Sequence, residues 1–370
     1  MTIPLSVLDL SPIPEGSTPA QALRNTLDLA RNAEEWGYAR YWVAEHHFAA
    51  VASSSPATLI GLIAAATNRI RVGSAAVQLG HHTPISVVES FGTVDALYPG
   101  RVDLGIGRSG QKRAEALAAG PAPIREARVV DGLLVPAPVS LAAALRATRL
   151  AATVSAVQFP GSKPPAFAGA LDDVLALLSG TFSYKDIPLE ATPGTGADLQ
   201  VWLFGSSGGE SAQLAGKLGL PFAANYHVSP ATTLDAVDAY RNAFVPSQRL
   251  AEPYIVVSAD AVVADDDETA RELASTFSTW VHSIRSGHGA IEYPKSAPAL
   301  TDDEAVLVAD RVETQFVGSA ATVVAQLETL ARVTGANELV VTGMTHDHED
   351  RKRSFQLLAK EWGLPALRVN

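Results

Sequence analysis

Short apolar segments alternate with helical patterns along most of the chain, and this alternation constrains the fold more than any other feature. Eight segments have the length and composition of buried strands, and a helical pattern follows each of them. The expected strands are residues 4–10, 39–47, 70–79, 101–107, 200–207, 221–227, 254–264 and 338–344. Regular strand–helix alternation favours a parallel sheet, and eight such units predict an α/β fold closed as a (β/α)8 TIM barrel.

Two segments break the alternation. Residues 120–170, after the fourth strand, are rich in proline, glycine and alanine, and residues 283–302, after the seventh, form a long polar stretch. Long connections of this kind often serve as lids or binding loops. We therefore expect insertions after strands four and seven. No serine- and glycine-rich or charged linker divides the chain, which predicts one domain over residues 1–370.

Composition excludes several classes of function. The formal net charge is −11, and no lysine and arginine cluster offers the basic face that nucleic acid or an anionic membrane surface requires. The chain has no cysteine, which excludes disulfides, thiolate metal sites and thiol nucleophiles. The first residues, MTIPLSVLDL, do not have the pattern of a signal peptide, and no apolar run is long enough to span a bilayer. We expect a cytoplasmic protein.

Polar residues gather at the predicted C-terminal ends of the strands, where a TIM barrel carries its active site. These ends carry Asp9, Glu45–His46–His47, Ala75–Ala76, Arg108, Ser206–Ser207 and Asn225–Tyr226–His227. The set offers a base and an anion site but no obvious complete metal site. His46 and His47 are adjacent in a predicted strand and would point to opposite faces, so one ion should not bind both. The run HDHED, residues 346–350, is interpreted mainly as the cap of the last helix, with metal binding as the alternative.

Two glycine-rich segments follow predicted strands. In GSSGGES, Gly205–Ser211, small residues and a helix N-terminus favour phosphate binding, but an ordinary tight turn with a serine cap would have the same pattern. GIGRSG, Gly105–Gly110, matches the dinucleotide fingerprint literally. However, it follows three strand–helix units, and the expected acid falls in an irregular region, so a Rossmann nicotinamide dehydrogenase is kept only as an alternative. Arg108 in this segment is suited to bidentate phosphate pairing.

An ordered set of segments resembles the bacterial luciferase-like flavin monooxygenases, in particular single-chain enzymes related to the luciferase α subunit. The segments are AEHHF at residues 44–48, VGSAAVQLGHHTP at 72–84, VESFGTVDALYPGRVDLGIGR at 88–108 and GSSGGESAQLAGKLGLP at 205–221. The likeness covers nearly the whole chain. It implies a TIM barrel that binds reduced FMN supplied by a separate flavin reductase. With O2 the reduced flavin would give a flavin hydroperoxide that oxygenates a small organic substrate, an aldehyde in the luciferases.

The resemblance also implies roles for individual residues. It makes His46 the catalytic base or proton donor, which suits an imidazole that titrates near neutral pH. It places Ala75 and Ala76, joined by a non-proline cis peptide bond, beneath the flavin, and Asn225 near the edge of the flavin ring. It assigns the FMN phosphate to Arg108, Ser206, Ser207, Gly208, Gly209 and Ser211.

The same resemblance implies a homodimer formed by the helices after strands two and three, in which His47 of one copy reaches Glu89 of the other. Glu45 would orient His46 or cap the following loop. Residues 283–302 correspond to a mobile loop that closes over the reduced flavin. Two departures are visible: Gly107 stands where luciferase α chains carry a reactive cysteine, and residues 120–170 match the luciferases poorly.

Two alternatives lie within the same superfamily. A related barrel would use a deazaflavin for hydride transfer without oxygen, and the absorbance of the bound cofactor would distinguish it. A second alternative is a protein that binds flavin without turnover, against which the presence of His46 argues. The identity of the substrate is not encoded in any segment that the resemblance covers.

Overall fold

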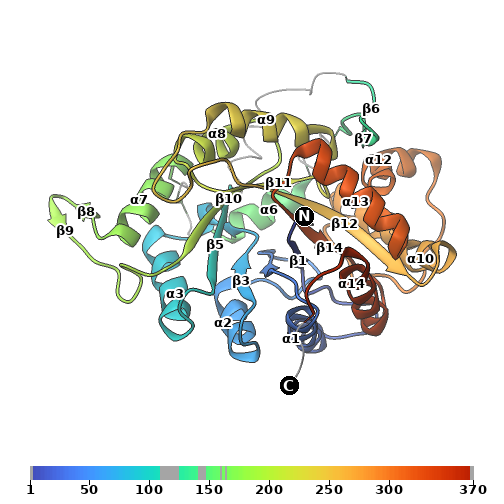
Figure 1. Cartoon of the computed structure of the whole chain (residues 1–370), viewed down its shortest axis with the longest axis horizontal. Coiled ribbons are helices and arrows are strands. Elements are labelled where there is room, and N and C mark those ends of the chain that lie inside the picture. The colour runs from blue at the N-terminus through green and yellow to red at the C-terminus, as the bar shows by residue number, and fades with distance from the viewer. Residues whose placement is uncertain (1–2, 109–124, 141–146, 159–160, 163–164, 367–370) are drawn as a thin grey trace.

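The computed structural model describes residues 3–108, 125–140, 147–158, 161–162 and 165–366. Within these ranges eight parallel strands close into a barrel: β1 (Leu5–Asp9), β2 (Arg40–Val43), β3 (Arg71–Ser74), β5 (Val102–Gly107), β10 (Gln200–Gly205), β11 (Phe222–Asn225), β12 (Ile255–Ala264) and β14 (Glu338–Thr342). Neighbours pair in that order, and β14 pairs with β1 to complete the ring. The predicted TIM barrel is confirmed (Figure 1). The Rossmann alternative is wrong because the sheet is closed.

Helices follow the barrel strands as the sequence pattern predicts. They are α1 (Pro19–Glu35), α2 (Pro56–Ala66), α3 (Pro84–Leu97), α7 (Phe167–Ser179), α8 (Glu210–Lys217), α9 (Thr233–Ala243), α13 (Ala320–Thr334) and α14 (His348–Trp362). The first three begin with proline, whose missing N–H has no helical partner to lose at that position. Asp347 caps α14 by accepting a hydrogen bond from the backbone N–H of Glu349 at 2.7 Å, which confirms the capping interpretation of HDHED.

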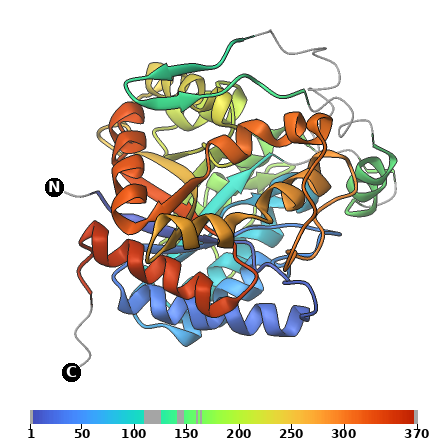
Figure 2. The ribbon, with the colours of Figure 1, turned by 90° about the vertical axis from the view of Figure 1, so that its right-hand side faces the viewer.

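The first insertion lies between β5 and α7, and its described part contains a hairpin and a helix. These are β6 (Arg128–Val130), β7 (Leu133–Val135) and α6 (Thr148–Ala156). The Tyr226 hydroxyl donates to the carbonyl of Leu134 at 2.7 Å, and Arg332 of α13 donates to the carbonyl of Asp131 at 2.8 Å. The hairpin therefore reaches across to the opposite side of the barrel, and Figure 2 shows it in teal along the top of the molecule.

The second insertion follows β12. It comprises α10 (Asp267–Ala274), α11 (Phe277–Arg285), α12 (Asp302–Glu313) and β13 (Phe316–Ser319), which pairs with the distal half of β12. Both predicted insertion points are confirmed. The expected polar stretch, residues 283–302, begins inside α11, and its central part is held against the loop after β1: Tyr293 N–H donates to Ile13 at 2.8 Å and Glu15 N–H donates to Tyr293 at 2.9 Å.

The remaining short elements are β4 (Val77–Gln78), β8 (Ser183–Tyr184), β9 (Ile187–Pro188), η1 (Leu79–His81) and η2 (Pro230–Thr232).

Aromatic side chains fill the middle of the barrel. The Trp42 ring meets the rings of Trp202 and Phe204 edge-on, with centroids 5.4 and 5.5 Å apart. Gly73 leaves room for this packing, because a Cβ there would lie 2.6 Å from the Trp42 ring. Below this layer, at the N-terminal ends of the strands, Arg40 pairs with both Asp103 and Glu338. No helix in the described ranges is both long enough and apolar enough to cross a membrane.

Candidate active site

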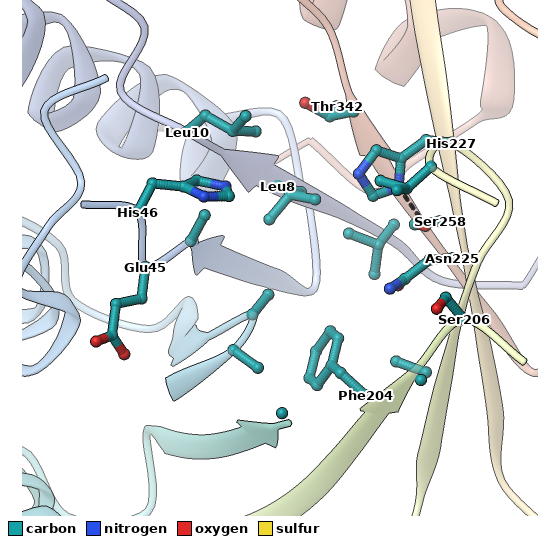
Figure 3. Close-up of a pocket in the computed structure, with 18 of the residues that line it drawn as sticks. Leu8, Leu10, Glu45, His46, Phe204, Ser206, Asn225, His227, Ser258 and Thr342 are labelled. Atoms are coloured by element: carbon teal, nitrogen blue, oxygen red, sulfur yellow. Dashed lines mark hydrogen bonds between the residues drawn. The ribbon is translucent and has the colours of Figure 1, made fainter. Parts of the chain in front are cut away.

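A cavity of about 450 Å³ opens at the C-terminal ends of the barrel strands (Figure 3). It is lined by all the residues predicted for the site except Gly208: His46, Ala75, Ala76, Arg108, Ser206, Ser207, Gly209, Ser211 and Asn225. Gly208 instead packs against α9, since a Cβ there would lie 2.9 Å from the carbonyl oxygen of Asp235. Asp9, at the first strand end, also lies outside the cavity lining, and its buried carboxylate accepts hydrogen bonds from Thr26, Tyr41 and Arg351.

His46 is positioned by backbone hydrogen bonds just after β2 ends. The N–H of Ala44 donates to Asp9 at 3.1 Å, and the N–H of His46 donates to Ser53 at 2.9 Å. The ring points into the cavity and is accessible from it (Figure 3). The surrounding protein still desolvates the imidazolium, and this lowers the pKa of His46; the charge of Glu45 opposes the effect. The ring is therefore a neutral imidazole near pH 7, able to accept a proton.

Glu45 points away from the His46 ring (Figure 3). Its buried carboxylate accepts a hydrogen bond from the backbone N–H of Gln78 at 2.8 Å and lies 2.9 Å from His47 Nε2 and 2.7 Å from His82 Nε2. Burial alone raises the pKa of Glu45, but the hydrogen bonds, led by that from His82, outweigh it and leave the pKa below its usual value. Glu45 thus ties the end of β2 to the segment after β3, and the expectation that it orients His46 is wrong.

The floor of the cavity is formed by Ala75 and Ala76, and the peptide bond between them is cis, as expected. The glycines of the GIGRSG segment allow β5 to approach this floor. A Cβ at Gly105 would lie 1.9 Å from the carbonyl oxygen of Ser74, and one at Gly107 would lie 3.2 Å from the Cβ of Ala76. These two glycines therefore serve strand packing. The last two positions of the segment, Ser109 and Gly110, lie outside the described residues.

Arg108 and residues 206–211 lie together at one part of the cavity wall, and we call them the anion cradle. The strand β10 ends at Gly205 and α8 begins at Glu210, so the cradle includes a helix N-terminus. A Cβ at Gly209 would lie 3.4 Å from Ser207 Oγ and 3.8 Å from Arg108 Nη2, and the glycine keeps that space open. Arg108 Nη1 lies 2.8 Å from the Glu210 carboxylate, which holds the guanidinium at the mouth of the cradle.

Sequence reasoning missed a second polar group, which we call the polar wall. It consists of His227, Asp260, Trp280, Arg311 and Thr342, and all five line the same cavity. Burial lowers the pKa of His227 to about 3, with Arg311 and His46 adding to the effect. Burial also raises the pKa of Asp260 to about 6 although Arg311 opposes it, and lowers the pKa of Arg311 to about 10. Arg311 is therefore cationic at neutral pH and His227 is neutral.

One sequence signal for the polar wall exists in β12. Val256, Ser258 and Asp260 alternate with outward-facing residues and line the cavity, so the two polar members of this row point into the barrel. A polar residue on the inner face of an otherwise apolar strand marks a site or a buried network. His227 stood among the strand-end residues without a role. Trp280 and Arg311 belong to helices of the second insertion, and no strand periodicity applies to them.

A second cavity of about 360 Å³, here called the side chamber, adjoins the first and shares Leu10, His46, Trp280 and Ile284 with it. Its further lining comes from the loop after β2, from α6, from Arg285 of α11 and from residues 287–290. Most of this lining is apolar, and its polar members are His47, Arg149, Thr153 and Arg285. Arg149 of α6 donates to the carbonyl of Phe48 at 2.9 Å and links the first insertion to the β2 loop. His46 therefore lines two adjoining spaces. The first cavity is polar at both ends, and the side chamber is mainly apolar.

One cluster of metal-ligand residues occurs among the described residues. Ligand atoms of Asp28, His348 and Glu349 lie within 4.8 Å of one another, between α1 and α14. The Lys352 ammonium already lies 3.0 Å from Asp28 and 2.9 Å from Glu349, so a cationic group neutralises both carboxylates. None of these residues lines the barrel cavity.

Comparison with known proteins identifies the family. A model of the luciferase-like monooxygenases matches residues 3–338. The chain belongs to this family. It is 38% identical over 365 residues to the uncharacterised protein YvbT of Bacillus subtilis, covering 97% of this chain and 96% of YvbT. It is 36% identical over 361 residues to a luciferase-like monooxygenase of Escherichia coli K12, covering 96% of each. As a member, the protein is an oxidoreductase that incorporates oxygen.

Solved structures agree with this membership. The crystal structure of apo-MsnO8 has a TM-score of 0.77 and 32% identity, covering 99% of this chain and all of that one. More distant structures show the fold alone. One is a 3,6-diketocamphane monooxygenase in complex with FMN, with a TM-score of 0.63 and 17% identity, covering 99% of this chain and 98% of that one. Another is an F420-dependent secondary alcohol dehydrogenase with an F420–acetone adduct, with a TM-score of 0.61 and 12% identity, covering 98% of this chain and 99% of that one. This fold therefore occurs with FMN in one of these proteins and with an F420 adduct in the other.

Proposed function

We propose that this luciferase-like monooxygenase binds reduced FMN and uses O2 to oxygenate a small organic substrate. The observation that carries the proposal is that one cavity contains the anion cradle, the Ala75–Ala76 floor and the His46 ring. These features come from strands far apart in the sequence, and they meet because the C-terminal ends of parallel barrel strands share one rim. The FMN complex of the related diketocamphane monooxygenase supports the choice of FMN.

The residues present fit a flavin phosphate and ring. Arg108 and Ser207 face the space that Gly209 keeps free of a side chain, and an Arg beside a helix N-terminus is suited to a phosphate. Ala75, Ala76 and Gly107 present only small groups at the floor, where a flat ring system needs an unobstructed surface. Asn225, at the end of β11, offers amide hydrogen-bonding groups to the same cavity (Figure 3).

Bound reduced FMN would supply the electrons that activate O2, so that one oxygen atom enters the substrate and the other leaves as water. The protein would contribute His46, whose lowered pKa keeps the imidazole neutral and ready to accept a proton beside the flavin. Residues 283–302 would limit access of bulk water, since Ile284 lines both cavities and Gly287, Gly289 and Ala290 line the side chamber. A separate flavin reductase would supply the reduced cofactor as a transient partner, and with it we propose a cytoplasmic location.

The test combines binding and reoxidation. Purified protein is titrated without oxygen with reduced FMN and, separately, with reduced F420, and O2 is then admitted while flavin absorbance is followed. We expect FMN to bind, and flavin reoxidation to proceed in two resolved phases. In His46→Ala, we expect FMN affinity to stay within about threefold of wild type. We expect the slow phase of flavin reoxidation to be lost, because the rate of that phase should change by about 100-fold or more. His348→Ala, which changes a histidine between α1 and α14 outside the linings of both cavities, is the control.

Two outcomes would contradict the proposal. Binding of reduced F420 with no binding of FMN would assign hydride transfer without oxygen. Binding of FMN with reoxidation kinetics identical to those of free flavin would assign a flavin-binding protein without turnover. In either case the barrel and the anion cradle would stand.

We further propose a homodimer through α2 and α3, which lie side by side on the outer surface (Figure 1). Three large apolar side chains on these helices are exposed in the single chain: Leu62 by 54%, Ile85 by 38% and Leu97 by 70%. Exposed apolar groups on neighbouring helices favour a protein interface. Glu89 of α3 is exposed on the same pair of helices, whereas His47 lies against Glu45 of its own chain.

A further inference from the structure

Three buried polar atoms of the polar wall have no hydrogen-bond partner among the described residues. They are Arg311 Nε, Trp280 Nε1 and Thr342 Oγ1. Their side chains are 8%, 4% and 1% exposed, come from α12, α11 and β14, and line the same cavity. A buried donor without a partner costs free energy, so three on one cavity wall indicate a ligand with oxygen acceptors. Figure 3 shows Thr342 beside His227, away from Ser206 of the anion cradle.

The charge of Arg311 is only partly neutralised. Among the described residues, the one carboxylate within 4.0 Å of its guanidinium is Asp260, at 4.0 Å, and Asp260 instead accepts a hydrogen bond from Gln315 Nε2 at 2.9 Å. The neighbouring Arg285 shows the contrast, because both of its terminal nitrogens bond to the Asp310 carboxylate. A ligand carboxylate would satisfy Arg311 in the same way.

The side chamber supplies a complementary apolar space. Trp280 belongs both to the polar wall and to the lining of the chamber, and Ile284, one helical turn further along α11, lines both cavities. His46 also lines both. A molecule with a polar head on Arg311 and an apolar body in the chamber would therefore pass the His46 ring.

We propose that the substrate of this enzyme is an organic anion whose carboxylate is bound by Arg311, Trp280 and Thr342 and whose apolar body fills the side chamber. This inference rests on the proposed function and refines its substrate class. The carboxylate subsite is built from β14, α11 and α12, whereas the anion cradle is built from β5, β10 and α8. Substrate and cofactor thus use different walls of one cavity and need not compete.

The test uses three probes of equal chain length: octanoate, octanol and octylamine. Each is titrated calorimetrically into the full-length protein without cofactor. We expect octanoate to bind at least about tenfold more tightly than octanol, because only the carboxylate can pair with Arg311, and octylamine to show no binding. Equal affinity for octanoate and octanol would overturn the proposal.

Variants locate the subsite. Arg311→Met should weaken octanoate binding by more than about tenfold, and Trp280→Phe and Thr342→Val by about three- to tenfold each. Thr342→Val removes only an atom that lacks a partner, so the midpoint of thermal unfolding without ligand should stay the same or rise. Trp280→Phe also removes buried ring carbons and should lower that midpoint, so its effect is judged by octanoate affinity alone. Arg353→Met, on the surface of α14, is the matched control and should bind octanoate as wild type does. If Arg311→Met does not fold, Thr342→Val and Trp280→Phe decide, and unchanged octanoate affinity in both would overturn the assignment.

The carboxylate subsite and the proposed FMN binding can be contradicted independently of each other. If octanoate binds in the expected pattern but neither oxidised nor reduced FMN binds, the cofactor proposal is wrong and the carboxylate subsite stands. If FMN binds to wild type and to Arg311→Met alike but octanoate binds to neither, the substrate proposal is wrong and the cofactor proposal stands.

Discussion

At the residue scale, the active-site cavity depends on a few side chains whose charge states are set by burial. His46 and His227 are both kept neutral, whereas Arg311 stays cationic because its pKa, although lowered to about 10, lies well above neutral pH. Asp260 is different, since its pKa of about 6 lies near the physiological range. It faces Arg311 and Gln315, and the Arg285–Asp310 pair lies next to Arg311. Asp260 is thus the residue of the polar wall whose charge changes near neutral pH.

Octanoate binding should therefore depend on pH through Asp260. As the pH rises from about 5 to 7, Asp260 ionises, partly neutralises Arg311 and repels a second carboxylate. We expect the affinity for octanoate to fall over this range, by about tenfold. Asp260→Asn should bind equally well at both ends of the range. Calorimetric titrations at pH 5.5 and 7.5 would measure this, and a pH dependence that persists in Asp260→Asn would contradict it.

The contact between Glu45 and His82 should give a pH-dependent contribution to stability. The pKa of Glu45 is lowered below 4.5, so its contribution is present above about pH 4.5 and is lost as the pH falls through the folded-state pKa. The pKa of His82 is raised above 6.5 by the hydrogen bond to Glu45, so its contribution is full below about pH 6.5 and is lost as the pH rises through the folded-state pKa. Both contributions are present only between these limits.

His82→Gln should accordingly destabilise the protein more at pH 6 than at pH 8.5. Urea unfolding of wild type and variant at the two pH values would measure the difference. His288→Gln, which changes an exposed histidine, serves as the control and should show no such difference. Equal destabilisation by His82→Gln at both pH values would show that the histidine is never charged in the folded state.

At the element scale, sequence patterns locate helices and strands well and their ends less well. The sequence pattern after the third strand predicts a helix from Pro84 to about Leu97, and α3 has these bounds, because a proline begins it and the apolar period is clear. The second strand was expected to extend through His47, but β2 ends at Val43. The next residues leave the sheet because Ala44, His46 and Ser53 bond across the turn. Tertiary hydrogen bonds of this kind have no local sequence signal.

Two glycine-to-alanine substitutions should have opposite effects on stability, because Gly73 in β3 is tightly packed and Gly169 in α7 has free space around it. Gly73→Ala places a methyl group 2.6 Å from the Trp42 ring and 2.7 Å from the Asp103 side chain, and should destabilise the barrel by about 1–3 kcal/mol or more. Gly169→Ala, near the start of α7, meets nothing within 4 Å and should stabilise by about 0.5–1 kcal/mol through helix propensity. Urea unfolding would compare them, and similar stability of the two variants would contradict the packing account.

At the scale of the whole molecule, the proposed dimer can be tested with a matched pair of surface substitutions. Leu62→Lys on α2 should convert a dimer into a monomer in sedimentation experiments, because a charge would be buried in the interface. Val306→Lys on α12 changes a residue that is 70% exposed elsewhere and should leave the dimer intact. Glu89→Ala should weaken the dimer if His47 reaches Glu89 across it. A wild-type monomer at micromolar concentration would contradict the proposal.

The sequence was sufficient for the barrel, its insertion points and most residues of the half of the cavity that is proposed to hold the flavin. Strand and helix periods are local, and a closed ring of eight parallel strands places their C-terminal ends on one rim regardless of the loops. The cis peptide and the anion cradle were reached through ordered motifs of the kind that a family shares. The role of Gly208 in binding the phosphate stays a prediction, since a motif does not show which of its glycines packs against α9.

The polar wall and the side chamber were decided by the tertiary structure alone. Trp280 and Arg311 lie on helices of the second insertion, and they reach the cavity only because that insertion folds back over the end of the barrel. Burial, which sets the pKa of Asp260 and leaves Thr342 without a partner, depends on all the elements that surround a residue. No local pattern carries that information, so the residues of the proposed cofactor side could be predicted from the sequence, whereas those of the proposed substrate side required the folded chain.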